Sequence, residues 1–158
     1  LALDLAEVGI TLDYLPLLDV RQPGAHNVIG DRALGTEPMQ VAALGRAVLD
    51  GLRPGGVLGC IKPMPGHGRA LADSHKELPV VDASLAELET DLTPFRTLAA
   101  APVGMTAHVR YSAWDAGRPA TLSPLVVGDV IRGQIGFDGL LLTDDIDMQA
   151  LAGSIGER

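Results

Sequence analysis

Cysteine, basic residues and long apolar runs are all scarce in this sequence. The 158 residues include one cysteine, Cys60, which cannot form a disulfide within the chain and therefore fits a reducing compartment. No apolar run approaches the roughly 20 residues that a transmembrane helix needs, so we expect no membrane span. Lys and Arg number 12 against 20 Asp and Glu, and the resulting charge of −8 argues against a nucleic acid as partner.

The composition that remains is typical of a globular domain. Apolar residues make up 47% of the chain and charged residues 20%, which is enough to bury a sizeable core and too apolar for a disordered segment. The sequence begins at Leu1 rather than at a methionine. We therefore expect an internal fragment of a longer protein, which says nothing of any targeting signal.

Short apolar runs alternate with amphipathic segments along the chain. The runs occupy residues 10–20, 56–61, 103–107 and 139–143, and they begin roughly 35–47 residues apart, the pitch of consecutive βα units. Their continuous apolarity is typical of parallel strands that are covered on both faces. Either a doubly wound sheet or part of a (β/α)8 barrel is expected, although no nucleotide-binding glycine motif follows the first run. Both architectures place functional residues at the carboxyl ends of the strands.

Helix signals occupy the segments between these runs. Thr36 is a good N-cap with Pro38 in the first turn, and a helical spacing predicts the buried positions Val41, Leu44, Val48 and Leu52.

Four further helix starts are expected downstream. Ser84 and Glu87 form a capping-box pattern. Thr93-Pro94 predicts that a separate helix starts there, Ser123-Pro124 predicts the start of another, and the chain again looks helical from Met148 onward.

The loop that follows the second run carries a possible acid–base pair. Asp73 and His75 are two residues apart, and in an extended loop their side chains point to the same side, so the carboxylate can bond the imidazole. Such a partner fixes the histidine tautomer and leaves the other ring nitrogen free to transfer a proton. The alternative is that Asp73 caps a turn and His75 is a solvated loop residue.

The fourth run ends on the acidic pair Asp144-Asp145. A carboxylate at the end of a barrel strand is placed to act as a nucleophile, a metal ligand or a helix cap. We expect one carboxylate of the pair to point into the site and the other to serve the local structure.

The remaining polar candidates are histidines and two cations. The four histidines are His26, His67, His75 and His108. No compact zinc-ligand motif connects them, so we predict no metal. We interpret His67, between two glycines, as a loop-shaping residue. Arg32 and Lys62 are candidate hydrogen-bond donors to a polar ligand, unless they are merely solvated or ion-paired surface cations.

Two longer stretches carry a resemblance to a known family. Residues 65–79 contain the Asp73/His75 pair, and residues 136–145 read GFDGLLLTDD. Together they resemble the bacterial β-N-acetylhexosaminidases of glycoside hydrolase family 3 (NagZ type). The resemblance covers essentially the whole chain and takes in Asp19, residues 29–32 and residues 107–112 in the family's order.

The resemblance implies a role for each candidate residue. Asp144 matches the nucleophile that forms a covalent glycosyl-enzyme, His75 the general acid/base, and Asp73 its orienting partner. Arg32 and Lys62 match donors to the sugar hydroxyls. Retention of configuration is implied, with histidine in place of the second carboxylic acid of the usual scheme.

The resemblance also implies an architecture. It identifies the chain, residues 1–158, as about four consecutive central βα units of a (β/α)8 TIM barrel, a partial catalytic domain whose first and last units are absent from the sequence. One position departs from the family, which usually has histidine directly after the lysine, whereas this chain has Pro63. Proline offers no side-chain donor and no backbone N–H, so one expected sugar contact is missing.

The function implied is that of a retaining exo-β-N-acetylglucosaminidase. Its expected substrates carry terminal β-linked GlcNAc, either in peptidoglycan-derived muropeptides during cytoplasmic cell-wall recycling or in chito-oligosaccharides. No cofactor is implied, and neither a nucleic acid nor a membrane is an expected partner. Two alternatives stay open: an amino-sugar-binding relative with weak or no activity, and a phosphorylase or transglycosylase on the same scaffold.

Overall fold

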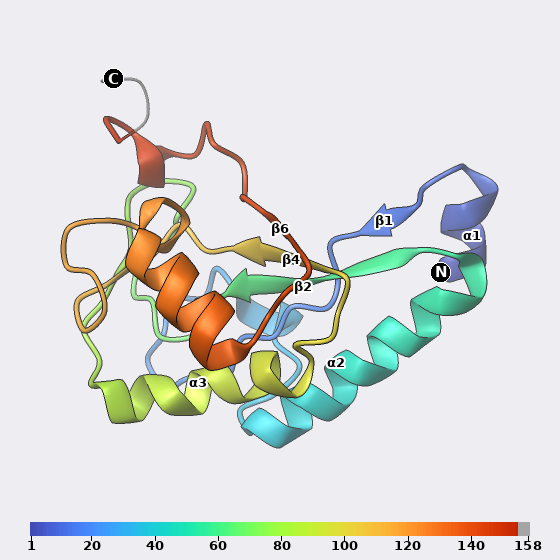
Figure 1. Cartoon of the computed structure of the whole chain (residues 1–158), viewed down its shortest axis with the longest axis horizontal. Coiled ribbons are helices and arrows are strands. Elements are labelled where there is room, and N and C mark those ends of the chain that lie inside the picture. The colour runs from blue at the N-terminus through green and yellow to red at the C-terminus, as the bar shows by residue number, and fades with distance from the viewer. Residues whose placement is uncertain (155–158) are drawn as a thin grey trace.

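The fold is organised around a parallel β-sheet, seen in a computed structural model that describes residues 1–154 (Figure 1). Its four strands lie side by side in chain order, and they are β1 (Leu12–Asp13), β2 (Leu58–Met64), β4 (Val103–Thr106) and β6 (Leu140–Leu142). This confirms an α/β fold with parallel strands at the four apolar runs. The described residues form an open sheet and do not close it into a barrel.

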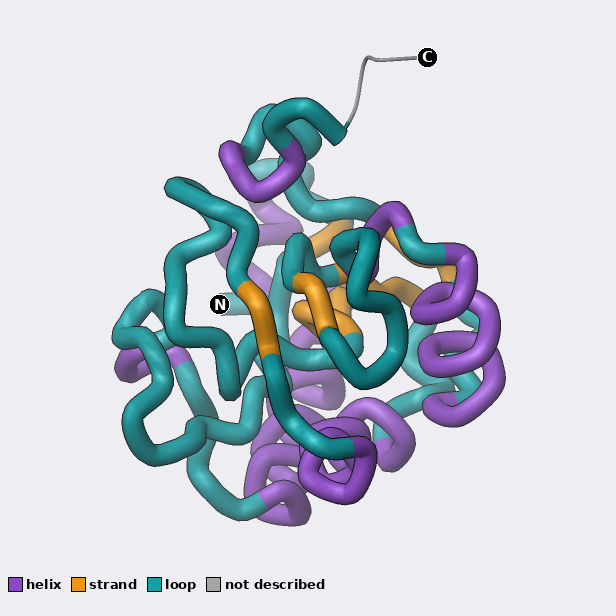
Figure 2. Tube along the Cα trace, turned by 90° about the vertical axis from the view of Figure 1, so that its left-hand side faces the viewer, coloured by secondary structure: helices purple, strands orange, loops and turns teal. Residues whose placement is uncertain are grey.

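Helical segments connect the strands and pack on one face of the sheet (Figures 1 and 2). The longest are α2 (Pro38–Leu52), α3 (Leu85–Thr97) and the π-helical η4 (Val126–Ile135). Short elements complete the chain: α1 (Ala2–Glu7), η1 (Gly30–Arg32), η2 (Arg53–Gly55), η3 (Ala120–Leu122), η5 (Gln149–Leu151), and the two-stranded parallel ladder of β3 (Val80–Val81) with β5 (Arg110–Tyr111).

The main core lies between the sheet and these helices. Glycines on the strands permit the close approach, because a Cβ on Gly59 would collide with Leu49 of α2, and one on Gly104 with Phe137. The largest fully buried side chains of this core include Leu18, Ile61, Leu92, Phe95, Ile131 and Phe137.

The opposite face of the sheet carries a second apolar cluster, built from strand residues alone. Cys60, Val103 and Met105 are buried in it, with partly buried leucines at their flanks. Towards the amino ends of the strands the same face is open, since Leu58 is 48% exposed and Leu140 61%. This apolar face is therefore buried at its centre and exposed at the amino ends of β2 and β6.

The helix α2 differs in detail from its prediction. It begins one residue later than expected, with Glu37 rather than Thr36 as N-cap. Leu44 was expected to be buried and is 42% exposed. The buried face instead passes through Gly45, where a Cβ would lie 2.6 Å from Leu18 Cδ2. The helix therefore packs through a glycine, which an apolar spacing pattern does not register.

The capping box at the start of α3 is confirmed. Ser84 N–H donates to Glu87 Oε2 at 2.8 Å, and Glu87 N–H donates to Ser84 Oγ at 3.3 Å. The expected new helix at Thr93-Pro94 is wrong, because Pro94 lies inside a continuous α3. Proline near the end of a helix removes a single intrahelical N–H, and burial of Pro94 and Phe95 offsets that loss.

The last two helix starts have different outcomes. Ser123 Oγ accepts Val126 N–H at 3.1 Å, so the predicted start at Ser123-Pro124 is confirmed. After Met148 the structure contains the single turn η5, and the part of that prediction beyond residue 154 lies outside the described residues.

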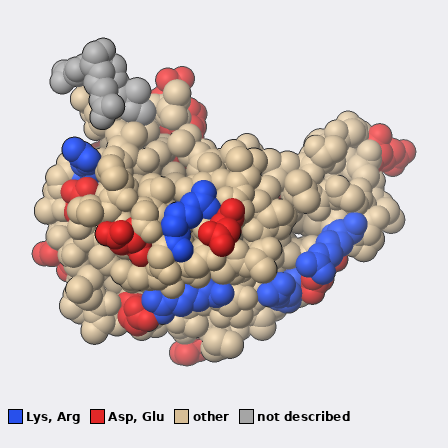
Figure 3. Space-filling model, in the orientation of Figure 1, with Lys and Arg blue, Asp and Glu red and all other residues tan. Residues whose placement is uncertain are grey.

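Within residues 1–154, no helix combines the length and apolarity that crossing a membrane requires. On the face drawn in Figure 3, acidic and basic side chains are interspersed over the surface.

Candidate active site

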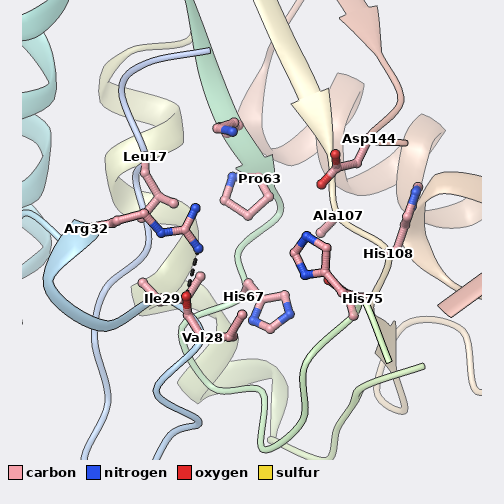
Figure 4. Close-up of a pocket in the computed structure, with 12 residues that line it drawn as sticks. Leu17, Val28, Ile29, Arg32, Pro63, His67, His75, Ala107, His108 and Asp144 are labelled. Carbon is pink, nitrogen blue, oxygen red and sulfur yellow. Dashed lines mark hydrogen bonds between the residues drawn. The ribbon is translucent and has the colours of Figure 1, made fainter. Parts of the chain in front are cut away.

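A pocket lies at the carboxyl ends of the strands (Figure 4). Four of the five predicted site residues line it: Arg32, Lys62, His75 and Asp144. They come from η1, from β2, from the loop after β2 and from the segment after β6. The topology thus brings together residues that are far apart in the sequence. Asp73, the fifth, contacts His75 from the side.

The Asp73/His75 pair has the geometry of a dyad. Asp73 Oδ1 lies 2.7 Å from His75 Nδ1 and also accepts the His75 backbone N–H at 3.0 Å. Hydrogen bonding from His75 lowers the pKa of Asp73 below its usual value, so this carboxyl stays ionised at neutral pH. The His75 side chain is 65% exposed and that of Asp73 15%. With Nδ1 engaged, His75 keeps Nε2 for a ligand.

The loop that carries this dyad is tied down at its base. The Asp19 carboxylate accepts the His67 N–H, and the Tyr111 hydroxyl donates to the Gly66 carbonyl oxygen. Further along, Ala70 O accepts a backbone N–H at 2.9 Å, and the β3–β5 ladder fixes the distal end. The dyad therefore lies on an anchored loop.

Asp19 itself is buried beside His67, and the sequence alone assigns it no role. Burial is the main cause that raises its pKa to about 7, the nearby charge of Asp91 adds to the rise, and the His67 N–H opposes it. Its second carboxylate oxygen has no hydrogen-bond partner within residues 1–154. The only signal was a carboxylate inside the apolar run that ends at Val20.

His67 lies in a loop, as interpreted from the sequence, and its backbone N–H donates to Asp19. Its ring also lines the pocket. Both ring nitrogens are buried without a partner among the described residues. Burial lowers the pKa of this imidazole, which favours its neutral form.

The adjacent carboxylates of Asp144 and Asp145 make different contacts. Asp144 is half-buried and lines the pocket, and its Oδ1 accepts the Asp145 N–H at 2.9 Å. Asp145 Oδ1 accepts the Asp147 N–H at 2.9 Å and so caps the following turn. Figure 4 shows the Asp144 carboxylate on the same side of the pocket as His75. One carboxylate faces the site and the other serves the local structure, as expected.

The two predicted donors also line this pocket. Arg32 is held by a 2.8 Å hydrogen bond from Nη2 to the Val28 carbonyl oxygen. Lys62 is half-buried, with Nζ 5.5 Å from the centre of the Tyr14 ring. Neither cation forms an ion pair within the described part of the chain. Pro63 also lines the pocket and presents no donor to it.

Two contacts of the pocket escaped sequence reasoning. His108 is buried with both ring nitrogens hydrogen-bonded, and the Ala150 N–H donates to Ser74 O at 3.2 Å.

No group of three or more His, Cys, Asp and Glu side chains within residues 1–154 is arranged to hold a metal ion. The chemistry that this arrangement offers is a carboxylate and an imidazole facing one cavity beside two cationic donors.

Comparison with known proteins gives consistent matches. A curated Beta-hexosaminidase of Chromobacterium violaceum is 43% identical over 157 residues, covering 98% of this chain and 43% of the relative. The solved NagZ of Neisseria gonorrhoeae, in complex with N-trifluoroacetyl-D-glucosamine, is 40% identical with a TM-score of 0.86, over 92% of this chain and 43% of its own.

A third match is a glycoside hydrolase family 3 beta-N-acetylglucosaminidase from Paenibacillus sp. str. FPU-7. It is 37% identical with a TM-score of 0.92, over 98% of this chain and 30% of that protein. The chain thus spans less than half the length of the curated relatives that it matches. The profile of the glycosyl hydrolase family 3 N-terminal domain matches residues 1–157. The chain therefore belongs to glycosyl hydrolase family 3.

Proposed function

We propose that the protein containing this chain is a retaining β-N-acetylhexosaminidase. The observation that carries the proposal is the shared pocket, in which Asp144 and His75 face one cavity and Asp73 holds the imidazole by Nδ1. Family membership supports a glycosidase, because relatives that match the whole of this chain are named Beta-hexosaminidase.

In the proposed first step, Asp144 attacks the anomeric carbon of the sugar and forms a covalent ester. The glycosidic C–O bond breaks, its electron pair goes to the leaving oxygen, and that oxygen takes the proton from His75 Nε2. In the second step His75 removes a proton from water, the water oxygen attacks the same carbon, and the Asp144 carboxylate leaves. Two displacements on one carbon retain the configuration.

The hydrogen bonds of the dyad suit this exchange of a proton. Asp73 is ionised at neutral pH and hydrogen-bonded to Nδ1 of His75. It therefore orients the His75 ring and stabilises the imidazolium that forms when Nε2 takes a proton. Arg32 and Lys62 line the same pocket and would donate to sugar hydroxyls.

The proposed substrate carries a terminal β-linked GlcNAc. Support comes from the gonococcal relative, whose structure contains an N-acylated glucosamine. Muropeptides or chito-oligosaccharides as the source of that sugar, and cell-wall recycling in the cytoplasm as its setting, rest on the family resemblance alone.

We also propose that the sheet is one wall of a (β/α)8 barrel, with residues 1–158 forming a part of that domain. In such a barrel the helices lie outside and the strand side chains that point inward fill a closed interior. The apolar face that carries Cys60, Val103 and Met105, on the side of the sheet away from the helices, is what the interior wall of a barrel requires.

The direct test uses the complete gene product and a chromogenic aryl β-GlcNAc. Wild type should hydrolyse it, whereas Asp144→Asn should lose at least about a thousandfold in rate, since the nucleophile of a covalent mechanism has no substitute. Asp145→Asn is the matched control, because its carboxylate caps a turn, and it should keep most of the activity. Equal losses in the two variants would contradict the assignment of Asp144.

Pro63 supports a second candidate, an amino-sugar-binding protein without turnover, because the pocket lacks the donor that the family usually has there. Titration calorimetry with GlcNAc, run beside the aryl-glycoside assay, distinguishes the two. Binding without turnover favours this candidate. Faster turnover on addition of inorganic phosphate, with a sugar phosphate as product, identifies a phosphorylase instead.

A further inference from the structure

His108 lines the pocket and has no part in the chemistry proposed above. His108 follows β4, is 2% exposed and has a partner for each ring nitrogen. Nε2 lies 2.9 Å from the backbone carbonyl oxygen of Asp145, and Nδ1 lies 2.7 Å from Thr121 Oγ1. His67, in the same pocket, has no partner for either nitrogen within the described residues. The fold therefore holds the His108 ring in one orientation.

The partners of His108 fix where its proton lies. A carbonyl oxygen only accepts, so Nε2 carries a hydrogen and donates it to Asp145. Thr121 Oγ1 lies 2.7 Å from Nδ1 and 2.8 Å from Thr106 Oγ1, and it is also anchored by a 3.0 Å hydrogen bond to the Ala107 carbonyl oxygen. The ring is thus supported from β4 and from η3, behind the pocket.

The hydrogen bond from His108 reaches the backbone of Asp145, the residue that follows Asp144. The Asp145 N–H donates to Asp144 Oδ1, and the Asp145 carbonyl oxygen accepts from His108. A rotation of this residue's backbone would move the N–H that orients the Asp144 carboxylate. His108 consequently acts on Asp144 through the Asp145 backbone.

A second connection ties the same segment to the dyad. The Ala150 N–H donates to the backbone oxygen of Ser74, which lies between Asp73 and His75. The segment after β6 is therefore linked to β4 through His108 and to the dyad loop through Ser74. These two links hold the segment that carries Asp144 to β4 and to the loop that carries His75.

We propose that His108 is a positioning residue that holds the Asp144 carboxylate against the sugar carbon. The inference rests on the proposed role of Asp144 as nucleophile. It requires that His108 affects the rate of attack on a bound sugar and leaves the binding of that sugar unchanged. A residue that served only the stability of the fold would leave both quantities unchanged in variant protein that folds.

The experiment follows attack by Asp144 in isolation. In the complete gene product, a fluorinated GlcNAc analogue that traps the covalent intermediate gives a maximal labelling rate and a half-saturating concentration. His108→Leu removes the donor to Asp145 and should lower the maximal rate roughly 10- to 100-fold, because small misplacements of a reacting group have effects of this size. The half-saturating concentration should not change.

His108→Gln is the matched variant, since its amide N–H can still reach the Asp145 carbonyl oxygen. It should recover most of the labelling rate that His108→Leu loses. Thr121→Val removes the support of Nδ1 at nearly constant volume, and it should lower the rate by less than His108→Leu. This variant also provides the test should His108→Leu fail to fold.

The possible results separate the two proposals. A wild-type protein that is not labelled at Asp144 contradicts the proposed nucleophile and removes the inference with it. Wild-type labelling that persists at full rate in folded His108→Leu, or in Thr121→Val where His108→Leu does not fold, contradicts the role of His108 alone. A rate for His108→Gln as low as that for His108→Leu contradicts it as well.

Discussion

At the scale of single residues, the loss of rate on replacing His75 should depend strongly on the leaving group of the substrate. General acid catalysis contributes about 10²–10⁴ in rate, and it is needed most when the leaving group is poor. We expect His75→Ala to lose activity on a GlcNAc disaccharide by that factor and less on the first step with an activated aryl glycoside. Added azide should restore turnover of the aryl glycoside and yield a β-glycosyl azide, because azide attacks without a general base. Rescue that yields an α-azide would assign His75 to the nucleophile's place.

Asp19 leads to a prediction about pH and stability. Its pKa is raised to about 7 in the folded chain against an ordinary value near 3.8, so between these values the folded state binds a proton that the unfolded state releases. The free energy of unfolding should therefore fall as pH rises through this window, by on the order of 4 kcal/mol in total. Asp19→Asn should flatten this dependence in urea unfolding between pH 4 and pH 7.5.

The control for that measurement is Asp129→Asn, which changes an exposed carboxylate on η4. It should leave the slope of unfolding free energy against pH as it is in the wild type. An Asp19→Asn variant with the wild-type slope would show that Asp19 is ionised in the folded protein.

At the scale of elements, two glycines of α2 allow a matched comparison. A Cβ on Gly45 would meet Leu18 Cδ2 at 2.6 Å and Leu98 Cδ1 at 3.0 Å, whereas one on Gly51 meets nothing within 4 Å. Both substitutions to alanine gain the same helix propensity, about 1 kcal/mol. Gly45→Ala should therefore be less stable than Gly51→Ala by about 1–3 kcal/mol, the range for overpacking a core. Chemical denaturation of both variants measures this difference, and equal stabilities would contradict the close packing of α2.

The sequence predicts the elements better than it predicts the contacts between them. The four parallel strands, the capping box at Ser84 and the helix start at Ser123 follow from local patterns, and the structure has all of them. The buried face of α2 passes through Gly45, and α3 continues through Pro94, because packing outweighs local propensity at both places.

The same division applies to the site. Motif order and strand ends were sufficient to select Asp144, His75, Arg32 and Lys62, which line one pocket, and Asp73 beside them. The sequence could not show that Asp19 is buried, that His108 bonds the Asp145 backbone, or that Ala150 reaches Ser74. Those facts depend on which segments the fold brings side by side.

At the scale of the whole molecule, the exposed part of the apolar sheet face should control whether the isolated chain self-associates. Leu58 and Leu140 are exposed on it, and β1 and β6 are open edge strands that expose unpaired backbone groups. We expect residues 1–158 alone to self-associate, and Leu58→Lys with Leu140→Lys to reduce that association, as measured by sedimentation velocity. A monomeric wild-type chain with a cooperative thermal transition would contradict this expectation.

The central claim is that Asp144 attacks the sugar, and trapping that intermediate tests it most directly. The complete gene product is incubated with the fluorinated GlcNAc analogue, digested with a protease and analysed by mass spectrometry. The mechanism predicts one added sugar on the peptide that contains Asp144, and none when His75 and Asp73 are intact but Asp144 is replaced by asparagine. A label on another residue, or hydrolysis of β-GlcNAc that continues undiminished in Asp144→Asn, would contradict it.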